Sequence, residues 1–188
     1  MAAFGAKYIN FAPVTKEPEK GLPLYGRRME IGEPVKTELA VKVVTGELYA
    51  DNRLKEREDE FVSGSLVVEV DDMTKETEAG IYGEAYEARE IVDRDSNHTP
   101  YGGLGYYKTL QRNEERIYEA HYYPKVKAVL GMDNAGTEGS SDFFTTKTIT
   151  FMICEPASGE WRYRKEFTSE AEAISYINRK LAAARSEG

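Results

Sequence analysis

The stretch FFTTKTITFMIC, residues 143–154, decides the fold class. Apolar and polar side chains alternate along it with a period of two, which is the pattern of a β-strand with one buried face. One face carries Phe143, Thr145, Lys147, Ile149, Phe151 and Ile153, and the other carries Thr146, Thr148, Thr150 and Met152. A strand with one apolar and one polar face is typical of an antiparallel sheet. The stretch therefore predicts a protein built mainly from antiparallel β-strands.

Further strands are predicted on both sides of this stretch. Alternation or short apolar runs mark residues 8–11, 39–45, 64–71, 84–92 and 161–167, with a shorter strand near 25–31. Residues 101–130 predict a hairpin that turns near 111–115. Pro124 lies in its second strand and lacks a backbone N–H, so it predicts an edge or a bulge there. The glycines at 102, 103 and 105 indicate a bend or bulge in the first strand.

Two helices complete the predicted fold. The first covers about residues 72–79, with Asp72 as its N-cap and Gly80 or Gly83 at its end. The second covers residues 169–185 and begins with a capping box formed by Ser169 and Glu172. Its apolar stripe consists of Ile174, Ile177 and Leu181. The elements predict a mainly β (α+β) fold, an antiparallel β-sandwich or barrel flanked by the C-terminal helix, in one domain spanning residues 1–188.

Residues 46–62 interrupt the strand pattern. Their central part, RLKEREDE at 53–60, is mostly charged and mixes both signs. Because the segment joins two good strands and is longer than a tight hairpin turn, we predict an extended charged loop. Apolar residues punctuate the charges, which favours a contact role over a merely solvated loop.

Composition limits the class of protein further. The formal net charge is −8 and the chain has one cysteine. The acidic balance argues against a protein that grips nucleic acid, because affinity for phosphates comes from Lys and Arg clusters. The N-terminal residues do not resemble a signal peptide, and no apolar run approaches the ~20 residues of a membrane-spanning helix. We expect synthesis in the cytosol and no membrane partner.

Residues that could carry chemistry are few. His98 and His121 lie in different predicted elements and in no metal-ligand motif, and His121 is expected to be a half-buried packing residue. Cys154 is expected to act as a small hydrophobe. The glycine run around Gly103 lacks the Lys and Ser or Thr of a phosphate loop. We therefore expect no catalytic residue, no cofactor, no metal ion and no enzymatic activity.

Several short motifs stand in a distinctive order along the chain. They are GAKYINFA (5–12), LYADN (48–52), FVSGSLVVEVDD (61–72), GLGYY (103–107), YPKVK (123–127), FTT (144–146) and TITF (148–151). In this order and spacing, over most of residues 5–167, the sequence resembles the phi13-type major tail proteins of siphophages and prophages of Gram-positive bacteria. The C-terminal helix is a departure from shorter members of that family.

The resemblance implies a tail-tube subunit with a β-sandwich fold. Six copies would form a ring, and rings would stack into a hollow tube around a tape-measure protein. Phage DNA would pass transiently through the lumen, whose acidic lining would repel phosphates. The tail terminator and the baseplate or distal tail proteins are further implied partners. The subunit would be assembled in the bacterial host cytoplasm and reside in the virion tail.

The charged segment 46–62 would then contact the neighbouring ring. The apolar anchors would be Leu48, Tyr49, Leu54 and Phe61, and the residues that meet acidic groups would be Arg53, Lys55 and Arg57.

Three alternatives remain open at the level of sequence. The inner tube of a contractile tail or of a tail-like bacteriocin is a close variant. A carbohydrate-binding or hydrolytic β-sandwich would need aromatic residues along a cleft, with a carboxylate pair for hydrolysis. A small-ligand barrel would be a closed monomer with an apolar cavity.

Overall fold

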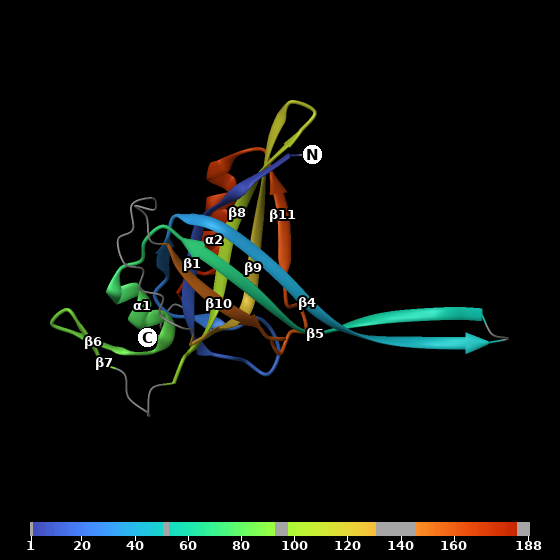
Figure 1. Ribbon diagram of the computed structural model, residues 1–188, viewed down its shortest axis with the longest axis horizontal. Coiled ribbons are helices and arrows are strands. Elements are labelled where there is room, and N and C mark those ends of the chain that lie inside the picture. Colours follow the sequence, from blue (N-terminus) through green and yellow to red (C-terminus); the bar gives the residue numbers. More distant parts are fainter. Residues whose placement is uncertain (1, 51–52, 93–97, 131–145, 184–188) are drawn as a thin grey trace, which may run out of the picture.

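The computed structural model describes residues 2–50, 53–92, 98–130 and 146–183, and within this range it describes the backbone but not the side chains of residues 2–4, 46–50 and 53–59 (Figure 1). The strands are β1 (Ala2–Lys16), β2 (Leu24–Tyr25), β3 (Met29–Gly32), β4 (Pro34–Ala50), β5 (Arg53–Val70), β6 (Ala85–Glu87), β7 (Glu90–Val92), β8 (Tyr101–Arg112), β9 (Glu115–Val129), β10 (Lys147–Ile153) and β11 (Tyr163–Phe167). The helices are α1 (Lys75–Tyr82) and α2 (Glu170–Lys180).

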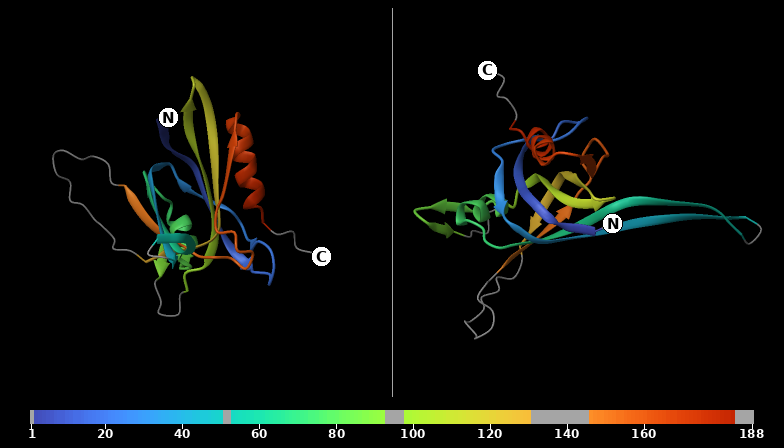
Figure 2. Two further views of the ribbon diagram at one scale, coloured as in Figure 1. Left: turned by 90° about the vertical axis from the view of Figure 1, so that its right-hand side faces the viewer. Right: turned by 90° about the horizontal axis from the view of Figure 1, so that it is seen from above.

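One sheet organises the molecule, in the order β2-β1-β8-β9-β10-β5-β4. β3 also pairs with β1, β11 also pairs with β9, and β6 and β7 form a separate small hairpin. Every pairing between these described strands is antiparallel. The predicted mainly β, antiparallel fold class is therefore confirmed. Figure 2 shows α2 lying against the face of β8, β9 and β11.

β9 is the strand at which the sheet divides. On one side it pairs with β8, while on the other it pairs with β11 along Tyr118–Tyr122 and with β10 along Val126–Val129. Pro124 lies in the interval between these two partners, where its missing N–H leaves no strand unpaired. The register between β8 and β9 also shifts between Gly102 and Leu104, opposite this interval. The bulge predicted from Pro124 and the glycines is confirmed.

Two hydrophobic cores lie on opposite faces of the strands that they share. The first core includes Phe11, Leu66, Tyr106, Tyr123 and Phe151, all at most 1% exposed. The alternation predicted for residues 143–154 is confirmed where β10 is described, because Ile149, Phe151 and Ile153 are buried in this core. Residues 143–145, which were predicted to extend the strand, lie outside the described part of the chain.

The second core fixes α2 to the sheet. Ala173, Ile177 and Leu181 of the helix are fully buried against Tyr107 and Tyr122. The glycines of β8 allow this close approach: a Cβ added at Gly103 would lie 2.7 Å from the Leu181 side chain. A Cβ at Gly105 would lie 2.8 Å from Ile177. Gly103 and Gly105 thus serve the packing of the helix as well as the bend that the sequence predicted.

The helix ends differ from those predicted. α1 begins after Thr74, whose side chain accepts a hydrogen bond from the Thr77 amide, so Asp72 is not the cap. The carboxyl of Asp72 accepts instead from the Met73 amide. Gly83 ends α1 in the left-handed conformation, as predicted.

α2 is shorter than predicted, because it ends at Lys180 rather than 185, and residues 184 and 185 lie outside the described part. Ser169 occupies the N-cap position but makes no side-chain capping hydrogen bond, so the predicted capping box is wrong.

The predicted loop at 46–62 is wrong, because the described residues of this segment continue β4 and β5. Their pairing continues from Val43 opposite Phe61 to Ala50 opposite Arg53, with one shift of register between Leu48 and Tyr49. We call residues 43–50 and 53–61 the arm. The mixed charges show no alternation of apolar and polar residues, so the sequence did not predict strands here. Mixed charge is nevertheless compatible with paired strands: Glu47 stands opposite Arg57 in the register, and opposite charges stabilise cross-strand positions.

Two other predicted strands also differ from the structure. Residues 84–92 form the β6–β7 hairpin, whose turn holds Ala88 and Arg89 at positive φ. The strand predicted at 161–167 begins only at Tyr163. Trp161 accordingly belongs to the first core, whereas Tyr163 and Phe167 pack against the second.

Candidate assembly surface

The arm projects from the body of the molecule as a two-stranded ribbon (Figure 1). β10 pairs with β5 only along Gly64–Val70, so residues 53–63 of β5 have β4 as their one described strand neighbour. β4 stands at the end of the sheet order, and no described strand pairs with its outer edge. Both edges of the arm are therefore open to pairing with another chain.

Apolar side chains at the base of the arm are exposed on both faces of the ribbon. Val43 is 44% exposed and Val44 is 57% exposed. Successive residues of a strand point to opposite faces, so these two valines show that neither face is fully covered at the base of the arm. Val41 and Val62 are 42% and 48% exposed beside them. Such a group of exposed aliphatic residues on unpaired strands marks a contact surface.

The root of the arm is anchored in its own chain. Phe61 stacks on Trp161, with ring centroids 4.2 Å apart and planes at 7°. The guanidinium of Arg162 lies 4.7 Å from the Trp161 ring centroid on which it rests. Both aromatic rings pack against the first core. The direction of the arm is therefore set where β5 passes the start of β11.

The contact residues predicted from sequence are placed unequally. Phe61 contacts its own core, so the structure gives it an anchoring position at the root of the arm. The backbone of the arm carries the other predicted residues, and their side chains lie outside the described part: Leu48, Tyr49, Arg53, Leu54, Lys55 and Arg57. The exposed valines were not singled out as contact residues, although their alternation was visible, because alternation alone does not say which face is covered.

His121 lies in a buried aromatic and cationic setting. The imidazole ring stacks on Tyr106 at a centroid distance of 4.9 Å. His121 was predicted to be half-buried, but the structure buries it. Burial, and then the charges of Lys108, Arg162 and Arg164, lowers the pKa of His121 to about 3. The Nε2 atom lies 2.6 Å from a Glu119 carboxylate oxygen, but burial and the cations outweigh this neighbour. The imidazole is consequently neutral near pH 7 and cannot serve there as a cation.

The remaining groups that could carry chemistry are weakly placed for it. Burial raises the pKa of the Cys154 thiol, which keeps it protonated and unreactive. His98 is exposed on the surface. Within the described ranges, no group of three or more His, Cys, Asp or Glu side chains is arranged to hold a metal ion.

One open pocket of about 430 Å³ lies beside the second core. Its lining consists of Lys20, Gly21, Leu22, Ala157, Ser158, Glu160 and Tyr163. Tyr163 offers an aromatic face, but Glu160 is the one carboxylate in this lining, and glycoside hydrolysis ordinarily needs two. The pocket therefore does not supply the carboxylate pair that a hydrolytic β-sandwich would require.

Neither α1 nor α2, the helices that the described ranges contain, is long and apolar enough to cross a membrane.

Comparison with protein-family models finds no model that matches the chain, and comparison with curated proteins finds no match.

Proposed function

We propose that this protein is a self-assembling structural subunit, and specifically a major tail-tube protein of a long-tailed phage or prophage. The observation that carries the proposal is the arm, a ribbon with two open edges and exposed valines on both faces. The order of motifs along residues 5–167 supports the more specific reading.

The physical argument begins with the stability of the arm. A two-stranded ribbon without a third strand or a packed face is marginally stable in water. The free energy that orders the arm then has to come from a partner surface. A second copy of the chain is the partner always present during synthesis, and copies joined head to tail close into rings when the rotation between them closes.

Strand addition across copies would also remove the exposed edge of β4. Pairing an edge with a neighbouring chain satisfies its backbone N–H and C=O groups, which otherwise invite unspecific aggregation. Rings built in this way would stack into a tube, with the tape-measure, terminator and distal tail proteins setting its length and ends. The net charge of −8 would keep the wall from binding the DNA that passes through it.

Negative-stain electron microscopy of the concentrated protein tests this proposal. Rings of six-fold symmetry or hollow tubes are expected, in the protein alone or after addition of a tape-measure protein encoded beside it. If the protein stays monomeric under all these conditions and binds a glycan saturably, the proposal is wrong and the carbohydrate-binding alternative takes its place.

A further inference from the structure

β11 has one edge paired with β9 and one edge that is open. Residues 163–167 pair with Tyr118–Tyr122 of β9, and no described strand pairs with the other side of β11. α2 covers one face of this strand, while Arg164, Lys165 and Glu166 are exposed. β11 is thus a short edge strand with free backbone groups and a charged rim.

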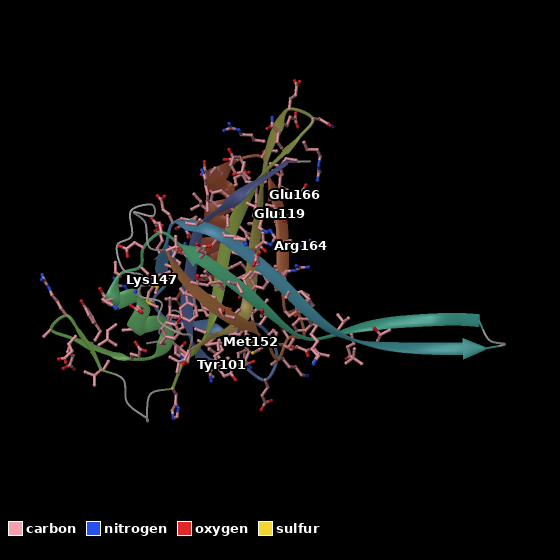
Figure 3. The ribbon with its side chains drawn as sticks, in the orientation of Figure 1. Tyr101, Glu119, Lys147, Met152, Arg164 and Glu166 are labelled. Carbon is pink, nitrogen blue, oxygen red and sulfur yellow. The ribbon has the colours of Figure 1, made fainter. Side chains whose placement is uncertain are left out.

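Cations predominate on the face of β11 that lies opposite α2. Arg164 stands opposite His121 and Lys108 stands opposite Glu119 in the register, so these two cations share a face of the sheet. Arg162 immediately precedes β11 and also acts electrostatically on His121. Glu119 and Glu166 stand opposite each other on the same side, as Figure 3 shows for these residues and Arg164. Arg112 lies 3.2 Å from Glu166 and completes the group. Glu115 stands opposite Arg112 and shares this face, so four cations face three carboxylates and the surface keeps a small positive charge in a chain of net charge −8.

The arm has the opposite charge and a matching form. Residues 46–60 contain six acidic and three basic residues. Positions 56, 58 and 60, all glutamate, fall on one face of β5 because alternate residues share a face. Val44 stands opposite Glu60 in the register and shares that face. The arm therefore presents a row of three carboxylate positions along an open strand edge.

We propose that the arm of one copy adds its β5 edge to the β11 edge of the next copy, with the glutamate row at positions 56, 58 and 60 beside Arg162 and Arg164. Arg164 lies within β11 and Arg162 immediately precedes the strand, so a strand added at this edge brings its own alternate residues next to Arg164. Backbone hydrogen bonds would supply affinity, and the charge row would select the register and the face.

This inference rests on the proposed self-assembly and specifies the contact that produces it. Phe61 and Trp161 hold the root of the arm beside the start of its own β11, and from there the arm projects away from the body (Figure 1), where it could reach another copy. The contact is head to tail, so it uses two different surfaces of each copy and can propagate around a ring.

Charge reversal tests the contact. Arg164→Glu and Glu58→Arg should each raise the protein concentration at which assemblies form by about tenfold, because each places like charges side by side. The double variant Arg164→Glu/Glu58→Arg should recover most of the loss. Lys7→Glu on β1 makes the same change in net charge at another exposed strand and should leave assembly unchanged. Assembly is measured by sedimentation velocity and electron microscopy, and folding by circular dichroism.

Cysteine pairing gives an independent readout. In a Cys154→Ala background, a Glu58→Cys chain mixed with an Arg164→Cys chain should form a disulfide-linked heterodimer on mild oxidation. The mixture of Glu58→Cys with Lys7→Cys should not. If the wild-type chain never associates, both self-assembly and this contact are refuted. If it forms tubes but Arg164→Glu assembles normally and no heterodimer appears, the β11 contact alone is refuted.

Discussion

At the scale of single residues, buried tyrosine hydroxyls hold the second core to β9. The Tyr25 hydroxyl donates a hydrogen bond to the carbonyl oxygen of Pro124 at 2.7 Å. It also lies 2.5 Å from the hydroxyl of Tyr122, which is fully buried. β2 is only two residues long, and these side-chain hydrogen bonds add to its backbone pairing with β1.

Tyr25→Phe should lower the free energy of unfolding by about 1–3 kcal/mol, because it leaves buried polar groups without a partner. Urea denaturation followed by circular dichroism measures the change. Tyr101→Phe is the matched control. Tyr101 is 42% exposed, and the cation–π contacts of Lys125 and Lys127 with its ring remain possible after the substitution. Equal stability of Tyr25→Phe and wild type would show that the hydroxyl network contributes nothing.

The Glu78 carboxylate joins α1 to the start of β10. It accepts hydrogen bonds from Lys75 at 2.9 Å and from Lys147 at 3.0 Å. Partial burial alone would raise the pKa of this carboxyl, but the two lysines outweigh it and the pKa is lowered. A lowered folded-state pKa means that the interaction stabilises the protein above the unfolded-state pKa and is lost as pH falls through the folded value.

Glu78→Gln should therefore destabilise the protein near neutral pH by up to about 1 kcal/mol, a small effect because the lysines are partly exposed. The two proteins should converge in stability as pH falls through the folded-state pKa of Glu78, which lies below its ordinary value, because the wild-type carboxyl then becomes neutral like the glutamine amide. Thermal unfolding across this pH range measures the difference. A gap that stays constant from neutral to acid pH would contradict the assignment of the lowered pKa to Glu78.

At the scale of elements, the closeness of α2 to β8 depends on glycine. A Cβ at Gly103 would lie 2.7 Å from both the Leu181 and Tyr25 side chains, which are buried and cannot move freely. Gly103→Ala should cost about 1–3 kcal/mol of stability through overpacking. Gly5→Ala, where a Cβ meets nothing within 4 Å, is the control and should be neutral or slightly stabilising. Comparable unfolding midpoints for the two variants would mean that α2 can shift to make room.

The arm should be dispensable for folding and required for assembly. Replacing residues 46–58 by an Asn-Gly turn joins Thr45 to Asp59, which stand opposite each other in the register. The core would be untouched, so stability should change by less than about 1 kcal/mol, while rings and tubes disappear. Unfolding curves and electron microscopy report the two properties separately. Tubes formed by the shortened chain would remove the arm from the mechanism of assembly.

The strands of the core could be predicted from sequence because burial of one face imposes alternation, as in Ile149, Phe151 and Ile153. The arm could not be predicted in this way. A ribbon with no covered face carries no alternation to detect, and RLKEREDE therefore appeared to be a loop. The contact residues predicted in this segment stay a prediction. That the segment forms paired strands depends on register, which sequence patterns do not encode.

At the scale of the whole molecule, the division of the sheet at Pro124 gives β9 a part in both cores. Val126 and Ala128 lie in the first core, while Ala120 and Tyr122 lie in the second. Neither core can open without breaking the pairing of this strand. The amide protons of residues 120–123 and 125–128 should then exchange with deuterium only through global unfolding, and more slowly than those of β6 and β7. The body of the protein would behave as one cooperative folding unit, in which a destabilising substitution in one core lowers the stability of the other core as well.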